Sequence, residues 1–170
     1  SVAHLDRALC FAGVANDYTT MYQICWQRAL AAEALARSTP SPALPPEILD
    51  LVSVCFELDD RYQIDPTSIR SECAAARWAV ELGQFDRASA FLDRAARRWS
   101  AEITILDEAQ FYRTRAALAH HSGGEPGLVR SDLERAAERY DLLGNEADAA
   151  AMRAMAAQTK STRKQGKRAP

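Results

Sequence analysis

Apolar side chains recur at intervals of three and four residues along most of the chain, which is the spacing of one face of an α-helix. Ile48, Leu49, Val52, Cys55 and Phe56 give an example of this spacing. β-branched residues are sparse, and only 7 Gly and 7 Pro interrupt the 170 residues. The pattern therefore predicts an all-α protein.

Prolines, glycines and polar turn residues divide the pattern into about eight helices. The expected ranges are 2–15, 18–37, a third helix beginning at Pro46, 66–82, 85–99, 105–122, 128–143 and 146–158. Connections such as the one at Gly83 are very short, so successive helices should fold back as antiparallel hairpins. A chain of 170 residues with 48% apolar residues is expected to form one domain over residues 1–158, with a looser helical part at 1–64 and hairpins at 65–158.

The hairpins contain an internal repeat, because residues 92–99 (LDRAARRW) align without gaps on residues 133–140 (LERAAERY). The same offset of 41 residues places Gly83 on Gly124. Both copies resemble the tetratricopeptide repeat, in which small side chains at the crossing of two helices allow close packing. The positions that carry this resemblance, over residues 69–140, are Ala76, Gly83, Phe85, Ala88, Leu92 and Ala95 in the first copy and Ala117, Gly124, Leu133 and Ala136 in the second. The second copy has Pro126 where the family has an aromatic residue, and the period exceeds the family's, which is about 34 residues.

The resemblance implies antiparallel hairpins stacked as a right-handed α-solenoid with a concave groove that binds a protein or peptide segment. In this family the first helix of each hairpin lines the groove. Arg70, Arg77, Arg113 and Arg115 lie on the two helices that should have this role, so they are the predicted partner-binding residues. The alternative is that these arginines form ordinary ion pairs on solvent-facing helices. An adaptor or sensor module, for instance the C-terminal part of a bacterial regulator, is the function we expect.

The distribution of charge adds two rival interpretations to this one. Net charge is only −2, but Lys160, Arg163, Lys164, Lys167 and Arg168 are concentrated in the last eleven residues, where apolar side chains are almost absent. We therefore predict a flexible basic tail over residues 159–170, and binding of nucleic acid or another polyanion through it is the main alternative function. An uncapped end of a repeat array could also pair with a second copy of the chain.

Candidate catalytic and metal-ligating side chains do not form a recognisable site. Cys10, Cys25, Cys55 and Cys73 are far apart and lie in apolar helical stretches, whereas zinc ligands usually occur in closely spaced pairs. They are expected to be buried free thiols in a reducing compartment.

The remaining polar clusters have simpler explanations as well. Adjacent residues of a helix point about 100° apart, so His120 and His121 cannot jointly bind one ion and are better explained as favourable charges at a helix C-terminus. The acidic run Glu57, Asp59 and Asp60 is expected to be a solvated helix end. The sequence thus predicts no catalytic residue, no metal and no cofactor, although an enzyme whose site lacks local motifs stays an alternative. No apolar run is long enough to span a membrane, and the N-terminus has no signal-peptide pattern, which predicts a cytoplasmic location.

Overall fold

The computed structural model describes residues 12, 16–38, 43–64, 69–100 and 102–165, and the side chains of 160–165 are not part of that description. Within these ranges the structure contains seven helices and no strand, which confirms the predicted all-α class. The sequence suggested one domain over 1–158, but the chain divides into two compact units, residues 1–66 and 67–170. The boundary lies close to the predicted change of character between residues 64 and 65.

The first unit contains helices α2 (Tyr18–Arg37) and α3 (Ile48–Tyr62), which pack on one another. Asp17 begins α2 as its N-cap, because its carboxylate accepts a hydrogen bond of 3.0 Å from the backbone N–H of Thr20. The rings of Tyr18 and Tyr62 stack at 3.9 Å between centroids, so the start of α2 lies beside the end of α3. The two helices are therefore antiparallel. Between them lies a small core of Tyr22, Cys25 and Cys55, with Trp26, Leu58 and Ile64 packed against it.

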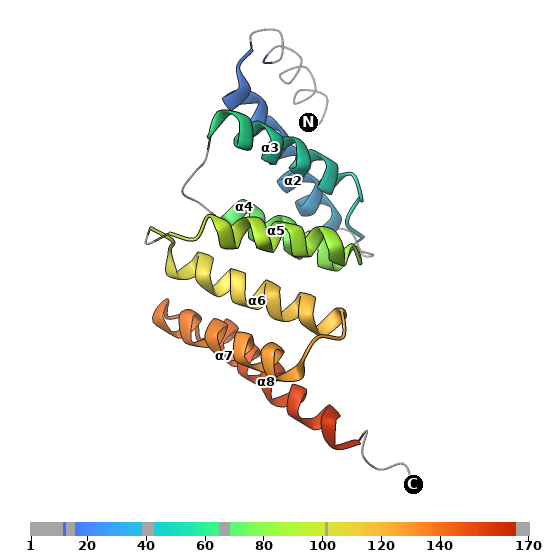
Figure 1. Cartoon of the computed structure of the whole chain (residues 1–170), viewed down its shortest axis with the longest axis vertical. Helices are drawn as coiled ribbons and strands as arrows, with labels where there is room; N and C mark the ends of the chain where they lie inside the picture. The colour runs from blue at the N-terminus through green and yellow to red at the C-terminus, as the bar shows by residue number, and fades with distance from the viewer. Residues whose placement is uncertain (1–11, 13–15, 39–42, 65–68, 101, 166–170) are drawn as a thin grey trace. The chain divides into compact units, whose positions relative to one another are not determined.

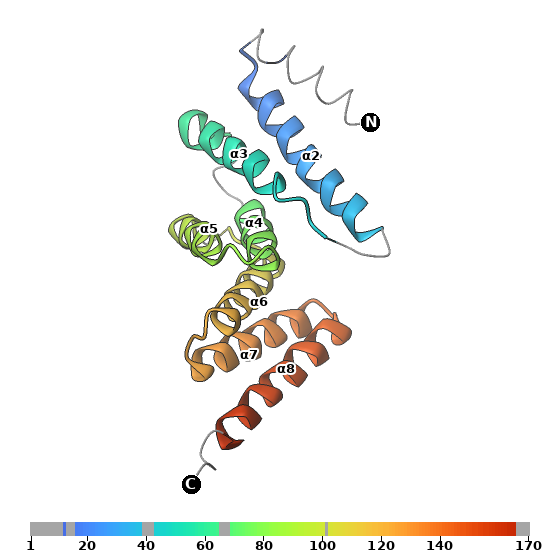
Figure 2. The same cartoon turned by 90° about the vertical axis from the view of Figure 1, so that its right-hand side faces the viewer.

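The second unit contains five helices: α4 (Arg70–Glu81), α5 (Phe85–Arg97), α6 (Ile105–His121), α7 (Pro126–Leu142) and α8 (Glu146–Gln165). Helices α4 and α5 form one hairpin and α6 and α7 a second, α8 packs on α7, and α6 packs on α4 and α5 (Figures 1 and 2). One core cluster of this unit joins α6, α7 and α8 and consists of Ala109, Ala116, Val129, Leu133, Ala136, Ala137, Tyr140, Ala149, Met152 and Ala156. Because so many of these side chains are alanine, the three helices can approach closely.

Most of the positions that carry the repeat resemblance are buried in this unit. Their exposed fractions are at most 5% for Ala76, Ala88, Leu92, Ala95, Leu133 and Ala136. Phe85 and Ala117 are half-buried. These side chains thus lie where close helix packing requires small and large residues.

Three helices in this unit end in the same type of turn. Gly83, Gly123 and Gly144 follow α4, α6 and α7, with φ of 70°, 73° and 70°. The residue after each glycine then donates its backbone N–H to a carbonyl five residues earlier: Gln84 to Ala79 at 2.8 Å, Gly124 to Ala119 at 2.7 Å, and Asn145 to Tyr140 at 2.9 Å. This is the left-handed helix ending that favours glycine.

The sequence alignment assigned the second of these turns to Gly124, and that assignment is one residue off. Gly123 has the left-handed conformation, and Gly124 stands where the first turn has Gln84. A β-carbon at Gly124 would lie 2.9 Å from the carbonyl oxygen of Ala119, so glycine is needed there for space. The second turn is therefore one residue longer than the first, which a gapless alignment cannot represent.

Replacing Gly83 by valine is expected to lower the melting temperature of the full chain by several degrees. A β-carbon at Gly83 would have no atom within 4 Å, so the effect comes from the left-handed backbone alone, at a cost of roughly 1–2 kcal/mol. The matched control is Gly127→Ala in the first turn of α7, where the residue is exposed and φ is ordinary, and this change should leave the melting temperature unchanged or slightly raised. A thermal melt in which both variants behave like wild type would contradict the turn at Gly83.

Most predicted helix boundaries agree with the structure, and the main differences lie at Pro46, Pro66, Pro126 and the C-terminal end. Helix α3 begins at Ile48 rather than Pro46, α4 begins at Arg70 rather than Pro66, and α7 begins at Pro126 itself, two residues before the predicted start. The predicted helix over 2–15 lies outside the described residues, apart from Ala12. Helix α8 continues to Gln165 instead of ending at residue 158, because polar Lys, Arg and Gln residues are good helix formers even without an apolar face. None of the helices in the described ranges combines the length and the apolar content that a membrane span requires.

Candidate functional site

The four predicted partner-binding arginines separate into two pairs in the second unit. Arg70 and Arg115 are hydrogen-bonded to buried aspartates of neighbouring helices, whereas Arg77 and Arg113 line one cavity together. The difference decides which side chains can reach a ligand without breaking the fold.

Arg115 on α6 is held by Asp132 on α7 through two hydrogen bonds. Its Nε and Nη2 donate to the two carboxylate oxygens at 2.7 and 2.6 Å, and Asp132 is fully buried. The guanidinium also lies over the rings of Phe111 and Tyr112, at 5.3 and 5.4 Å from their centroids. The hydrogen bonds to Asp132 raise the pKa of Arg115 above its ordinary value. This arginine therefore holds the α6–α7 hairpin together.

Arg70 at the start of α4 has a comparable place. Its Nε donates to Asp107 at 3.1 Å, and Asp107 is itself buried in the first turn of α6, where its backbone N–H donates to the N-cap Thr104 at 3.2 Å. The pair thus joins α4 to the N-terminal end of α6. Replacing Arg70 would disturb the contact between two hairpins as well as any ligand.

Arg77 and Arg113 meet in a polar cavity of about 230 Å³ between α4 and α6. The side chains that line it are Cys73, Ala74 and Arg77 from α4, Gln110, Arg113 and Thr114 from α6, and Tyr140 from α7. Two cations and no carboxylate belong to this lining. Each guanidinium has an exposed acidic neighbour just outside it, Glu81 at 3.5 Å from Arg77 and Asp148 at 3.8 Å from Arg113. Such long, exposed ion pairs are weak and can be exchanged for a ligand carboxylate.

Cys73 contributes a thiol to this lining, and the protonated form of that thiol is favoured. Burial, helped by the nearby carboxylates of Glu72 and Asp107, raises the pKa of its thiol well above the ordinary value. Since the thiolate is the reactive species, Cys73 is an inert wall of the cavity at neutral pH.

A second, larger cavity of about 400 Å³ lies between α6, α7 and the C-terminal half of α8. Its lining is mainly apolar: Ala116, Ala117, Val129, Leu133, Pro126, Gly124 and Met155, with His120, His121, Gln158 and Thr159 as the polar side chains. His120 and His121 are exposed at the end of α6, where His121 Nδ1 lies 2.8 Å from the carbonyl oxygen of Ala117. Both histidines thus lie at the helix end that the sequence predicts, and they border a cavity that it does not predict.

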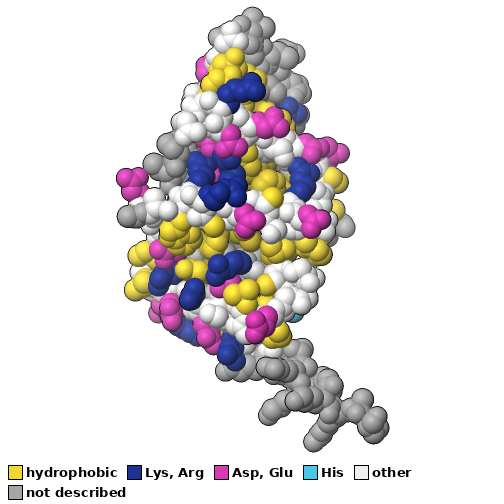
Figure 3. All heavy atoms as spheres, in the orientation of Figure 1, with side chains coloured by type: hydrophobic (Ala, Val, Ile, Leu, Met, Phe, Trp, Pro, Cys, Tyr) yellow, Lys and Arg dark blue, Asp and Glu magenta, His cyan; other side chains and the backbone are white. Residues whose placement is uncertain are grey.

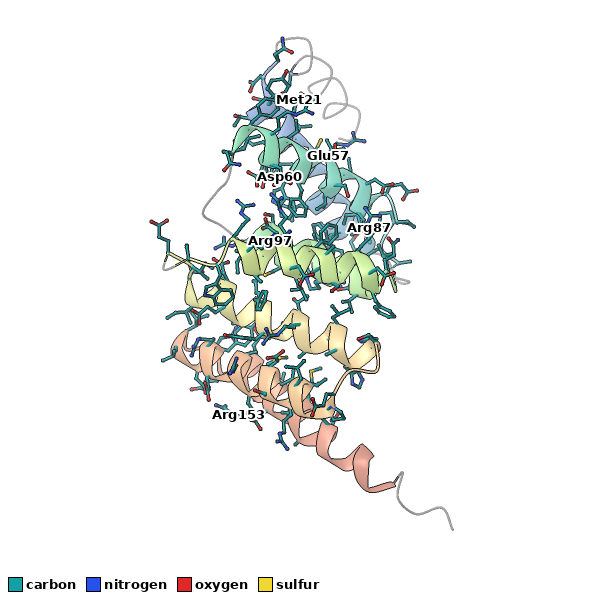
Figure 4. The ribbon with its side chains drawn as sticks, in the orientation of Figure 1. Met21, Glu57, Asp60, Arg87, Arg97 and Arg153 are labelled. Atoms are coloured by element: carbon teal, nitrogen blue, oxygen red, sulfur yellow. The ribbon has the colours of Figure 1, made fainter. Side chains whose placement is uncertain are left out.

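A buried carboxylate, Glu72 on α4, is the polar centre that sequence reasoning missed. It is fully buried and accepts hydrogen bonds from Arg94 Nε at 3.1 Å and Arg98 Nη1 at 2.5 Å, both on α5, and from Ser71 Oγ at 3.0 Å. Basic side chains gather over α5 on the face drawn in Figure 3, and Arg97, which neighbours Arg98 in the chain, is labelled in Figure 4. A signal was present in the sequence, because Glu72 is spaced by four and seven residues from the apolar Ala76 and Ala79 and so lies on the inner face of its helix.

The acidic run on α3 differs from its predicted role in one residue. Glu57 and Asp60 are exposed, but Asp59 is 3% exposed, because it follows Val52, Cys55 and Phe56 at helical spacing on the buried face of α3. In the described part of the chain no three or more His, Cys, Asp or Glu side chains are grouped so that they could hold a metal ion. Cys25, Cys55 and Cys73 are buried and free, as the sequence predicts, and Cys10 lies outside the described residues.

No family model matches the chain, and neither a curated protein nor a solved structure matches it. The geometry of the two cavities is therefore the observation that bears on function.

Proposed function

We propose that the second unit, residues 67–170, is a peptide-binding module of the tetratricopeptide-like kind, which holds an acidic segment of a partner protein between α4 and α6. The observation that carries the proposal is the convergence of Arg77 and Arg113, from two different helices, on one cavity whose lining has no carboxylate. A carboxylate side chain of the partner would replace Glu81 and Asp148 as the acceptor for these guanidinium groups. Arginine suits this role because its planar fork donates two parallel hydrogen bonds to a carboxylate.

The other polar side chains of the cavity support the same ligand. Gln110, Thr114 and Tyr140 carry amide and hydroxyl groups that can donate or accept hydrogen bonds, as a peptide backbone requires. The remaining lining residue of α4, Ala74, is small and leaves the peptide backbone room between the helices. A protein ligand with at least one exposed Asp or Glu is therefore the partner class.

The test is a selection of displayed random peptides on the full chain, followed by affinity measurements with the enriched sequences. Enriched peptides should carry Asp or Glu. The double variant Arg77→Ala/Arg113→Ala should bind them about tenfold more weakly, which corresponds to about 1.4 kcal/mol. Because the ion pairs of Arg77 with Glu81 and of Arg113 with Asp148 are long and solvent-accessible, their loss should cost little, and the variant should melt within a few degrees of wild type.

The matched control is Arg130→Ala/Arg153→Ala, which removes the same charge from α7 and α8. These arginines have exposed fractions of 42% and 55% and acidic neighbours of their own, Glu134 and Asp141, and Arg153 is seen at the lower edge of the unit in Figure 4. Affinity should be unchanged in the control. The proposed binding of an acidic peptide between α4 and α6 would be refuted if the selected peptides were not enriched in Asp or Glu. An equal loss of peptide affinity in the two double variants would refute it as well.

The basic tail supplies the rival outcome. Replacing Lys160, Arg163, Lys164, Lys167 and Arg168 by glutamine should leave peptide affinity within a few-fold of wild type. The opposite outcome has two parts: the wild-type chain binds duplex DNA or RNA with an affinity that falls steeply with salt, and the glutamine variant loses both nucleic-acid binding and peptide binding. That outcome would favour the nucleic-acid function over the peptide-binding function.

A further inference from the structure

The two cavities of the second unit share one face of helix α6. The α6 residues in the polar cavity are Gln110, Arg113 and Thr114, and those in the apolar cavity are Ala116, Ala117, His120 and His121. All of these residues except Ala116 follow Gln110 at helical spacings of three, four, seven, ten and eleven residues. They therefore form a single stripe along the helix, at positions 110, 113, 114, 117, 120 and 121. A ligand that lies along this stripe would therefore meet both cavities.

The chemistry of the two cavities is complementary rather than repeated. The cavity at Arg113 has two cations in its lining, whereas the cavity at Ala117 has no Asp, Glu, Lys or Arg among its lining side chains and is formed mainly by Ala, Val, Leu, Pro and Met. At about 400 Å³ the apolar cavity has the size of sites that enclose small apolar ligands, which is ample for one aromatic or large aliphatic side chain. Met155 on its edge is 46% exposed, and its flexible thioether can adapt to different apolar groups.

The distance between the cavities sets the spacing of the two ligand side chains. The centres of the two sets of α6 residues are between six and seven positions apart, or about 10 Å along the helix axis. In an extended polyproline-II peptide, side chains three residues apart point in the same direction and are separated by about 9 Å. An acidic residue and an apolar residue at that spacing would enter the two cavities together.

We infer that the α6 stripe is a two-part recognition site for an extended peptide that carries an Asp or Glu and, three residues from it, a large apolar side chain. The acidic side chain lies between Arg77 and Arg113, and the apolar one fills the cavity bordered by Ala117, Leu133 and Met155. This inference depends on the proposed function and adds a sequence rule for the partner. Charge complementarity positions the acidic side chain of the peptide between the two arginines. Burial of the apolar side chain in the second cavity adds to the binding free energy.

Synthetic fluorescein-labelled peptides of Gly, Ser and Pro provide the probe, with one Glu alone or with one Glu and one Phe at spacings of two, three, four and seven residues. The full chain should bind the peptide with spacing three about tenfold or more tightly than the Glu-only peptide. Best binding at spacing seven would mean a helical ligand and would overturn the extended arrangement.

Two variants of the apolar cavity complete the test. Ala117→Phe fills the cavity and Met155→Asp places a charge at its edge, and each should reduce the affinity for the Glu–Phe peptide to that for the Glu-only peptide. The matched control, Ala154→Asp, adds the same charge at an exposed position of α8 outside the cavity lining and should change nothing. Thermal melts of the three variants show whether each is folded.

The outcomes separate this inference from the proposed function. If the Glu-only and Glu–Phe peptides bind equally and both depend on Arg77 and Arg113, the second anchor is refuted and the acidic-peptide function stands. If neither kind of peptide responds to Arg77→Ala/Arg113→Ala, the proposed function itself fails. Equal loss of Phe-dependent affinity in Met155→Asp and Ala154→Asp would also refute the apolar anchor.

Discussion

Replacing Glu72 by alanine is expected to lower the free energy of unfolding by about 3 kcal/mol, and the melting temperature by roughly 10 °C. Glu72 is fully buried, and the side chains of its partners Arg94 and Arg98 are only 13% and 15% exposed. Without the carboxylate, two poorly solvated guanidinium groups from one end of α5 would be left next to each other against α4. Removing one member of a buried ionic group costs more than the group itself contributes, because the remaining charges stay desolvated.

Glu81→Ala is the matched control for this prediction, since it removes a carboxylate from the last turn of the same helix. Glu81 is exposed and lies 3.5 Å from Arg77, so its loss should change the unfolding free energy by less than about 0.5 kcal/mol. Urea denaturation of both variants, followed by circular dichroism, gives the comparison. Equal midpoints would mean that the Glu72 carboxylate is not desolvated in the folded chain.

A triple variant separates two contributions to the loss of stability: the buried charges that remain and the space left by the truncated side chain of Glu72. Replacing Glu72 by Leu and both Arg94 and Arg98 by Met removes the charged group as a whole and keeps apolar bulk at all three positions. Buried ionic groups replaced in this way often leave stability unchanged or increase it. The triple variant should therefore be more stable than Glu72→Ala, and a result below Glu72→Ala would assign the effect to packing.

The helices of this chain could be predicted because their ends are marked by local chemistry. Helix α5, for example, begins two residues after Gly83, and α2 begins directly after Asp17, where a short acidic side chain caps the first turn. The choice between Gly123 and Gly124 could not be made in the same way. Either glycine could adopt the left-handed conformation, and only the folded turn shows that Gly123 adopts it, while Gly124 is needed for space beside the Ala119 carbonyl.

The candidate site was only half accessible to sequence reasoning. The prediction that the first helices of the hairpins carry groove arginines named Arg77 and Arg113 together with Arg70 and Arg115. What distinguishes Arg70 and Arg115 is a buried aspartate on another helix: Asp132 is 17 residues from Arg115, beyond the i+3 and i+4 spacings that a single helix reveals. Buried ion pairs between helices depend on how the hairpins cross, and local spacing does not record this.

The apolar cavity escaped prediction for a related reason. Ala117 and Leu133 were assigned to helix packing in the repeat. Leu133 does lie in the core of α6, α7 and α8, whereas Ala117 is half-buried, and both border the cavity with Met155 of α8. Small side chains allow two helices to cross closely, but they leave empty space where a third helix runs away from the crossing. A cavity is a property of three helices together, so the spacing within any one of them cannot indicate it.

Ala95→Leu is expected to destabilise the chain by about 1–3 kcal/mol, because Ala95 is fully buried on α5 and a leucine side chain would need space that a packed core does not have. Its neighbour Ala96 is exposed on the same helix, so Ala96→Leu introduces the same side chain one position away without a steric conflict. That control should change the unfolding free energy by no more than about 0.5 kcal/mol. The comparison cancels any effect of leucine on helix propensity, since both substitutions are in the last turn of α5. Ala136→Leu, at the equivalent position of the second hairpin and inside the α6–α7–α8 core, should repeat the result of Ala95→Leu.

Denaturation midpoints that fall for Ala95→Leu and Ala136→Leu but not for Ala96→Leu would show that the two aligned alanines are equivalent crossing points of related hairpins. A midpoint for Ala95→Leu no lower than that for Ala96→Leu would remove Ala95 from the helix crossing and, with it, the physical basis of the repeat.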